Sequence, residues 1–211
     1  MKRNTVVLGV TLALLALFAW AGWANWMRRQ QQAEQLLANA AKGTLVPNTQ
    51  GGAPHYSTPL EGKPAPAFAL EDLSGHKVRL EDFRGKAVLL NFWATWCGPC
   101  KIETPWLVEL RNKYAAEGFE VIGISTEGED LKPGDKAGLE RQRDGVKKFV
   151  AEMKVPYPML LGGDALSQPY GGLDAMPTSF YLDRNGVVVA AQMGLSSAAE
   201  MEANIHKALG K

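Results

Sequence analysis

The hydrophobic positions form two kinds of pattern, one long apolar run near the amino terminus and shorter patterned segments further on. From Thr5 to Ala24 almost every residue is apolar, and about 20 such residues match one crossing of a lipid bilayer. Beyond this run, short apolar stretches alternate with segments in which apolar residues recur at helical spacing. Such stretches indicate buried strands, and such spacing indicates amphipathic helices. The pattern therefore predicts a transmembrane anchor over residues 5–24 and an α/β domain further along the chain.

Two interpretations fit the amino-terminal run. A cleaved signal peptide would use the basic start of the chain and an Ala-x-Ala site formed by Ala19 and Ala21. An uncleaved anchor explains the tryptophans near the far end of the run, because aromatic residues gather at membrane interfaces. These tryptophans are Trp20, Trp23 and Trp26. The sequence favours the anchor, with residues 1–4 as a short cytoplasmic tail, and leaves the signal peptide open.

A stalk and a flexible linker are expected over residues 25–61. The first part, up to about Ala41, is polar with interspersed Ala and Leu, and Gly, Pro, Ser, Thr and Asn predominate from Gly43 to Pro59. Such a composition has few side chains that can form a core, so it is typical of a spacer. The globular domain is therefore expected over residues 62–211.

Strands and helices are expected to alternate through this domain. The strongest strand signal is Ala87–Trp93, and Glu120–Ser125 is also nearly all apolar, which is typical of buried parallel strands. A helix is expected between them, from about Cys97 to Ala116. A right-handed crossover of this kind would bring both strand ends to the same edge of the sheet.

The remaining segments complete an α/β fold with a central mixed β-sheet flanked by helices. The polar segment Thr126–Leu139 is expected to be a loop on the active side of the sheet that contacts protein partners. Asp183–Gly186 predicts a hairpin turn, because Asn-Gly adopts positive φ at little cost. The other expected elements are the strands Phe68–Glu71, Lys77–Leu80, Thr178–Leu182 and Val187–Met193, the helical turns Leu80–Phe83 and Asp164–Tyr170, and the helices Glu140–Met153 and Ser197–Leu209.

Charge and cysteine content narrow the function. The formal net charge is +1, so no strong field favours nucleic acid. The two cysteines both lie in Cys97-Gly98-Pro99-Cys100, and so short a loop stabilises a fold little. This spacing indicates redox or metal chemistry. No metal is expected, because a zinc site needs more ligands and the histidines His55, His76 and His206 are widely scattered.

The redox interpretation follows from the place of the cysteines between a strand and a helix. Cys97 falls at the helix amino terminus, where free N–H groups and the helix dipole stabilise a thiolate. Cys100 lies one turn further on, where it can attack a mixed disulfide formed at Cys97. We expect Cys97 to be exposed and Cys100 to be buried behind it.

The segment from Asn91 to Lys101 resembles the active-site segment of thioredoxins, and Gly98-Pro99 is the dipeptide that thioredoxin itself uses. From roughly Gly62 to Leu209 the chain is most similar to the TlpA/ResA/CcmG group of thioredoxin-fold proteins. The resemblance implies a membrane-anchored thiol–disulfide oxidoreductase without a cofactor, facing the periplasm or the cell exterior. It further implies a reductase that serves cytochrome c or oxidase assembly.

The resemblance also implies roles for individual residues. Glu103 corresponds to an acid characteristic of the extracytoplasmic group, and Pro105 to the proline that kinks the active-site helix. Met176-Pro177-Thr178 resembles the cis-proline loop opposite the cysteines. Asn91 stands where thioredoxins proper carry a buried Asp. The implied substrate-binding residues are Trp96, Gly98, Pro99, Met176 and Pro177.

Glu103 has a further argument from helix geometry. Residues three apart share a helix face, so Glu103 lies about one turn beyond Cys100. Burial raises the pKa of a thiol and slows its attack unless a base accepts the proton. We therefore expect Glu103, with a pKa raised by burial, to help deprotonate Cys100.

The partners implied are extracytoplasmic protein disulfides, with apocytochrome c or a copper-site protein as candidates, a membrane electron donor of the DsbD/CcdA type, and lipid around residues 5–24. The implied location is the cytoplasmic membrane, crossed once. A Sco-like copper metallochaperone is one alternative, but its cysteines are spaced Cys-x-x-x-Cys and work with a histidine. A peroxiredoxin-type peroxidase is another, but Leu90 and Ala94 occupy the diagnostic Pro and Thr/Ser positions of its motif.

Overall fold

The computed structural model describes residues 20, 27, 58–127 and 136–211. The chain divides into two compact units, residues 1–48 and 49–211. In the first unit only Trp20 and Met27 are described, and each is an exposed helical residue. The predicted tail, anchor and signal-peptide site, and the linker up to residue 57, otherwise lie outside the described residues. Within the described part of the chain, no helix has both the length and the apolar character needed to cross a membrane.

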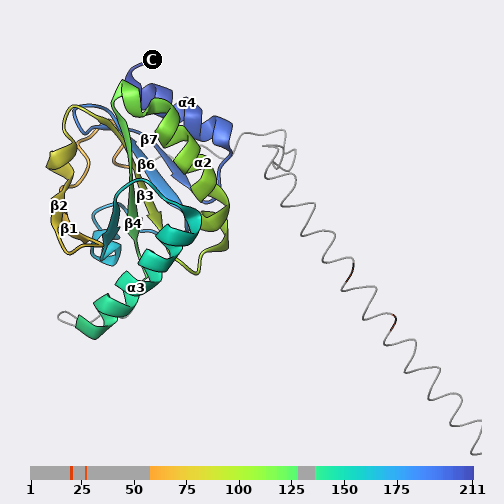
Figure 1. Ribbon diagram of the computed structural model, residues 1–211. Coiled ribbons are helices and arrows are strands. Elements are labelled where there is room, and N and C mark those ends of the chain that lie inside the picture. The colour runs from red at the N-terminus through yellow and green to blue at the C-terminus, as the bar shows by residue number, and fades with distance from the viewer. Residues whose placement is uncertain (1–19, 21–26, 28–57, 128–135) are drawn as a thin grey trace, which may run out of the picture. The chain divides into compact units, whose positions relative to one another are not determined.

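Seven strands of the described domain form one mixed sheet in the order β2-β1-β5-β4-β3-β6-β7 (Figure 1). The pairs β3–β4 and β4–β5 are parallel, and all other pairings are antiparallel. This arrangement confirms the predicted α/β fold with a central mixed sheet. The strands are β1 (Ala69–Asp72), β2 (Lys77–Arg79), β3 (Ala87–Trp93), β4 (Phe119–Ser125), β5 (Met159–Leu161), β6 (Thr178–Leu182) and β7 (Val188–Met193).

The two central strands set the position of the site. Every residue of β3 and β4 is buried, as their apolar sequences predict. They pair in parallel from Ala87 opposite Phe119 to Trp93 opposite Ser125, so both end at the same edge of the sheet. The predicted crossover is confirmed, and the segments that follow Trp93 and Ser125 start side by side.

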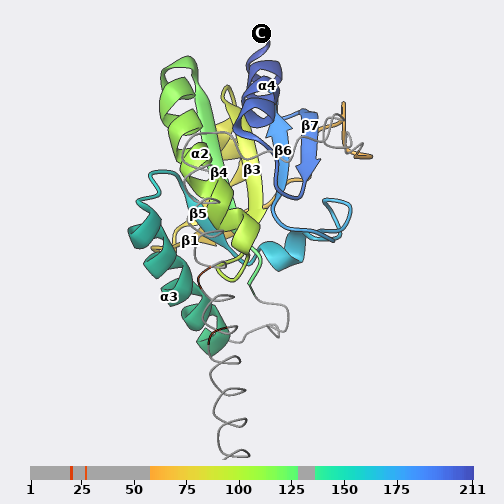
Figure 2. The ribbon, with the colours of Figure 1, turned by 90° about the vertical axis from the view of Figure 1, so that its right-hand side faces the viewer.

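Three α-helices, α2 (Gly98–Tyr114), α3 (Lys136–Met153) and α4 (Ala198–Leu209), pack on one face of the sheet. Because side chains alternate along a strand, Leu89 and Trp93 of β3 face these helices, whereas Leu90 and Phe92 face the other side. The second face is covered by the 3-10 helices η1 (Leu80–Phe83) and η3 (Gly163–Leu166) and by loops. Figure 2 shows the three α-helices in front of the sheet.

The largest difference from the sequence prediction is the start of α3. The helix begins at Lys136, within the segment Thr126–Leu139 that was expected to be a loop. Gly138 in its first turn is a poor helix former, which explains why sequence pattern did not extend the helix this far. The expected partner-contacting loop is therefore shorter than predicted, and its residues 128–135 lie outside the described part of the chain.

The 3-10 helix η2 (Ala115–Glu117) follows α2.

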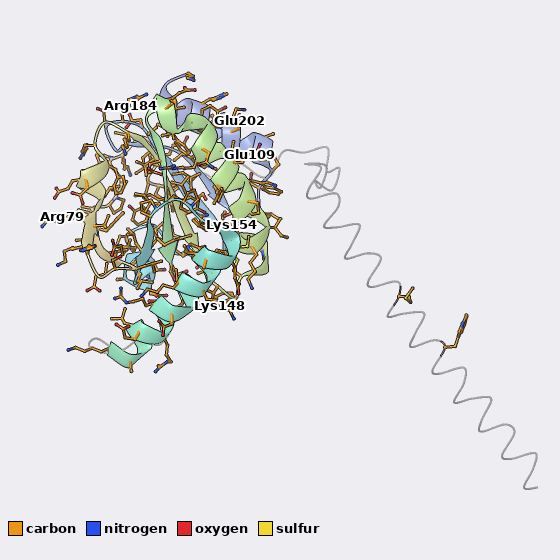
Figure 3. The ribbon with its side chains drawn as sticks, in the orientation of Figure 1. Arg79, Glu109, Lys148, Lys154, Arg184 and Glu202 are labelled. Atoms are coloured by element: carbon orange, nitrogen blue, oxygen red, sulfur yellow. A yellow bond between two sulfur atoms is a disulfide. The ribbon has the colours of Figure 1, made fainter. Side chains whose placement is uncertain are left out.

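Arginines join the connections at the sheet end where β3 and β4 begin. Arg184, in the turn between β6 and β7, donates hydrogen bonds to the carbonyl oxygens of Gly85 at 3.1 Å and Glu117 at 2.9 Å. Arg84 in turn donates to the carbonyl oxygen of Asn185. These bonds hold together the turns before β3 and β4 and the predicted β6–β7 turn. Figure 3 shows Arg184 at this end of the molecule.

Both edges of the sheet have particular features. Strand β2 has only three residues, with exposed Lys77 and Arg79 at its ends. Along β7, the N–H of Gly62 donates to the Val188 carbonyl at 2.8 Å, and the Val188 N–H donates to the Lys63 carbonyl at 3.0 Å. The segment before β1 therefore pairs with the start of β7.

Candidate active site

The two cysteines lie at the amino terminus of α2 and form a disulfide with 5.3 Å between their Cα atoms. Cys97 is the N-cap residue, and its Sγ accepts a hydrogen bond from the Cys100 N–H at 3.2 Å. Pro99 is tolerated in the first turn because its missing N–H would have no partner within the helix. The strand–helix junction predicted from sequence is confirmed.

The expected exposure of Cys97 is wrong. Cys97 is 4% exposed and Cys100 is 1% exposed. The N–H of Cys97 donates to the Ala94 carbonyl at 3.1 Å, and its own carbonyl accepts from Lys101 N–H at 3.3 Å, so its backbone lies within a closed turn. Gly98 and Pro99 next to it are exposed, so solvent reaches the rim of the site.

This geometry favours dithiol–disulfide chemistry at Cys97. In the reduced protein, the same amide and the positive end of the helix dipole stabilise a thiolate on Cys97. Cys100 is also buried, which disfavours its thiolate, and it lies inside the first turn of the helix and not at the N-cap position. The arrangement favours Cys97 as the attacking thiol and Cys100 as the resolving thiol, and these two roles stay predictions.

Glu103 is a buried carboxyl on the second turn of α2, 1% exposed. The Asn91 side-chain amide donates to its Oε1 at 2.6 Å and also contacts the Ser179 hydroxyl oxygen at 3.1 Å. Burial raises the pKa of Glu103 to about 8, and the Asn91 hydrogen bond offsets this effect only in part. The raised pKa predicted from sequence is confirmed, and the carboxyl can hold or release a proton near neutral pH.

Two buried tyrosines share this polar region. Burial, and secondarily the charge of Glu103, raise the pKa of Tyr157 and of Tyr181. Both phenols are therefore neutral over the range in which Glu103 titrates. Glu103 is the group in this cluster suited to proton transfer near neutrality.

Pro105 lies inside α2, as expected from the resemblance. It has no N–H to donate to the carbonyl of Lys101 one turn before it. The Thr104 hydroxyl donates an additional hydrogen bond to the Cys100 carbonyl at 2.7 Å. The helix hydrogen bonding is thus altered directly beyond the cysteines.

The Met176–Pro177 peptide bond is cis, as predicted. Met176 is half-buried and packs against the cluster that contains both cysteines. Its Sδ lies 3.2 Å from the Thr126 hydroxyl oxygen. Pro177 is buried, and its carbonyl accepts from Gly194 N–H at 2.7 Å. The role of these two residues in substrate binding stays a prediction.

Three large hydrophobic side chains are exposed in residues 58–127 and 136–211. Trp96 precedes Cys97 and is 59% exposed, as a partner-contact role requires. Ile102 follows Cys100 by two residues, and Leu195 follows Gly194, which bonds to Pro177. Sequence reasoning missed Ile102 and Leu195. Ile102 could have been found from the sequence, because it is an apolar residue on the otherwise polar side of α2.

Glu127 is a further residue that sequence reasoning missed. It lies at the end of β4 and accepts two hydrogen bonds from Thr95, one from the backbone N–H and one from the hydroxyl at 2.7 Å. The sequence placed it in a polar loop, and nothing in the local pattern pairs it with Thr95. Across the described residues, no group of three or more metal-ligating side chains comes together.

Comparison with known proteins shows matches over most of this domain. The model of the AhpC/TSA family matches residues 62–191. The thiol-disulfide oxidoreductase ResA of Bacillus thuringiensis is 35% identical over 147 residues, covering 69% of this chain and 77% of that protein. The thioredoxin-like protein YneN of Bacillus subtilis is 34% identical, covering 67% of this chain and 76% of that protein.

A solved structure agrees with these matches. The crystal structure of a thiol:disulfide interchange protein of the thioredoxin family from Chlorobium tepidum superposes with a TM-score of 0.58 at 30% identity. The match covers 70% of this chain and 96% of that one. The thioredoxin-like fold expected from the resemblance is thereby confirmed.

Proposed function

Because this chain belongs to the AhpC/TSA family and is a TlpA/ResA/CcmG-like thiol–disulfide reductase, we propose that it acts outside the cytoplasm on protein disulfides during cytochrome c or oxidase assembly. The observation that carries the reductase chemistry is the Cys97 sulfur, capped by the Cys100 amide at the start of α2. The peroxidase alternative does not gain from the family match, because Leu90 and Ala94 still occupy the diagnostic positions.

In the first step the Cys97 thiolate attacks one sulfur of a substrate disulfide. A bond forms between Cys97 Sγ and that sulfur, and the substrate S–S bond breaks. The second substrate sulfur leaves as a thiolate and takes up a proton from solvent. The product is a mixed disulfide between Cys97 and the substrate.

In the second step Cys100 resolves the mixed disulfide. Its thiol loses a proton, its sulfur attacks Cys97 Sγ, and the remaining substrate sulfur leaves as a thiolate. Two electrons have then passed to the substrate, and the protein carries the Cys97–Cys100 disulfide seen in the structure. Glu103, in its ionised form, accepts the proton of the buried Cys100.

The exposed apolar side chains support a polypeptide as substrate. Trp96 and Ile102, which flank the two cysteines in sequence, are exposed, and exposed apolar side chains favour contact with protein. The proposed function requires the Met176 backbone to lie beside Cys97, where a substrate strand would pair with it. We propose Trp96, Gly98, Pro99, Met176 and Pro177 as substrate-binding residues.

The proposed location rests on the amino-terminal sequence. Residues 5–24 would anchor the chain in the cytoplasmic membrane as a single span, with the catalytic domain in the periplasm or outside the cell. In an oxidising compartment the disulfide must be reduced again, so we propose a membrane electron donor of the DsbD/CcdA type. Apocytochrome c or a copper-site assembly protein is the proposed substrate.

Trapping tests the substrate. A Cys100→Ser variant of the full chain, expressed in cells, cannot resolve its mixed disulfide and should accumulate the natural partner on Cys97. Identification of a cytochrome c or a copper-site protein by mass spectrometry would support the proposal. A Cys97→Ser/Cys100→Ser variant is the matched control, and exclusive capture of cytoplasmic proteins would contradict the proposed location.

A further inference from the structure

Thr126 and Glu127, the two residues that follow β4, form hydrogen bonds with the end of β3 and with the segment between β3 and the cysteines. Thr126 bonds to the Trp93 carbonyl through its N–H at 2.9 Å and its hydroxyl at 3.1 Å. The same hydroxyl lies 3.2 Å from Met176 Sδ. Glu127 then accepts the N–H and the hydroxyl of Thr95. This short segment therefore joins the strand that precedes the cysteines to the Met176–Pro177 loop.

The parallel register explains why these residues meet. Trp93 and Ser125 are paired at the ends of β3 and β4, so the next residues of both strands emerge together. Thr95 lies two residues beyond β3, and Glu127 lies two residues beyond β4. A carboxylate that accepts both donors of one residue holds it more firmly than a single neutral bond does.

Thr95 is close enough to Cys97 for its hydrogen bonds to Glu127 to affect the position of Cys97. Two peptide units separate them, so their Cα atoms are at most about 7 Å apart. Cys97 N–H closes a turn onto the Ala94 carbonyl, and Thr95 lies within that turn. Holding Thr95 therefore fixes the start of the turn that makes Cys97 the N-cap of α2.

We propose that Glu127 is a positioning residue, which holds Thr95 and thereby keeps Cys97 Sγ at the amino terminus of α2. In the oxidised protein the disulfide itself restrains Cys97. In the reduced protein that restraint is gone, so the bonds from Glu127 contribute more. Glu127 thus stabilises the reactive, reduced form, a role that rests on the dithiol chemistry and not on the proposed location or partner.

Two neutral substitutions separate the hydrogen bonds from the charge. The Glu127→Gln side chain can still accept from the Thr95 N–H and can donate to its hydroxyl, whereas Glu127→Ala can do neither. Both variants lack the carboxylate charge, so a difference between them reports the hydrogen bonds. With the full chain in detergent, we expect site-resolved alkylation of reduced Cys97 to be roughly three- to tenfold slower in Glu127→Ala than in Glu127→Gln.

The redox equilibrium is the second measurement. The equilibrium constant for reduction of the Cys97–Cys100 disulfide should be three- to tenfold lower in Glu127→Ala than in Glu127→Gln. For a two-electron couple this factor lowers the reduction potential by about 15 to 30 mV. A purely structural role would lower thermal stability without moving either quantity. Equal alkylation rates and equal potentials in the two variants would overturn the proposal.

Matched controls keep the result interpretable. Glu109→Gln removes an exposed carboxylate from α2 and should change neither quantity. If Glu127→Ala does not fold, Thr95→Val removes the donated hydroxyl and Thr95→Ser keeps it, so only the first should slow alkylation. No difference between these two would then refute the proposal. Failure of the unmodified protein to reduce any disulfide would instead refute the reductase function.

Discussion

The two ends of the central sheet can be compared through the polar groups that lie at each. Where β3 and β4 begin, Arg184 and Arg84 bond to the carbonyls of three connecting turns. Where the same strands end, the carboxyl of Glu103 is buried with a raised pKa, and Trp93 Nε1 and Ser125 Oγ have no hydrogen-bond partner. The first end has polar groups that pair across the connecting turns, and the second end has some buried polar groups without a partner.

The comparison indicates where this domain gains stability and where it gives some up. An unsatisfied buried polar group costs about 1–3 kcal/mol, a large fraction of the stability of a domain. Such costs are commonly tolerated at reactive sites and compensated elsewhere. We therefore expect substitutions at the cysteine end to change chemistry, and substitutions at the arginine end to change stability.

Substitution of the cysteines should have the largest effect. Cys97→Ser should abolish reduction of insulin disulfides, because the attacking thiolate is lost. Cys100→Ser should retain the attack and accumulate mixed disulfides. Both variants should keep a folded far-ultraviolet circular dichroism spectrum. Faster alkylation of Cys100 than of Cys97 in the reduced protein would reverse the assignment of their roles.

Glu103→Gln should change both stability and its pH dependence. Below about pH 4.5 the carboxyl is protonated in the folded and the unfolded chain. Between there and about pH 8 only the unfolded chain releases the proton, so the free energy of unfolding of the parent protein falls as pH rises. The total loss is roughly 3–5 kcal/mol. Urea unfolding from pH 4 to 9 should show this fall in the parent and not in the variant.

The same variant tests the proton-transfer role of Glu103. Release of a preformed mixed disulfide should be slower in Glu103→Gln, and the pH–rate profile of reduction should shift to higher pH. If the free energy of unfolding changes with pH in the same way in the parent and in Glu103→Gln, the pKa of Glu103 is not raised. If the pH–rate profile is the same in both, Glu103 has a structural role only.

Arg184→Ala should have the smallest effect, confined to the opposite end. Loss of its two hydrogen bonds to backbone carbonyls should lower the free energy of unfolding by about 1–3 kcal/mol. Insulin reduction per folded molecule should stay the same. Exposed Arg141→Ala on α3 serves as a control for the loss of a positive charge. A change in activity without a change in stability would break the contrast between the two ends.

Local pattern predicted most of the fold. The bounds of β3 and β6 agree with the prediction. For β3 the reason is its nearly continuous apolar run, which leaves little freedom of placement. The start of α3 was missed, because the apolar spacing there is interrupted by glycine and charged residues. Short-range spacing also placed Glu103 beyond Cys100, and its burial follows from the apolar face of α2.

Contacts between distant segments were the part that sequence reasoning could not supply. Thr95 and Glu127 are far apart along the chain and meet only because β3 and β4 are parallel and in register. The burial of Cys97 depends on a turn closed by Ala94, which the strand–helix boundary alone does not reveal. Family resemblance supplied the Met176–Pro177 loop, which composition and periodicity do not mark.

The edges of the sheet have a consequence for self-association. An open strand edge invites pairing with a second copy, and short, charged edge strands discourage it. Strand β2 is three residues long with Lys77 and Arg79 exposed, and residues 62–65 already pair with the start of β7. We therefore expect the domain to resist edge-to-edge aggregation, an advantage for a catalyst that would be crowded onto a membrane surface.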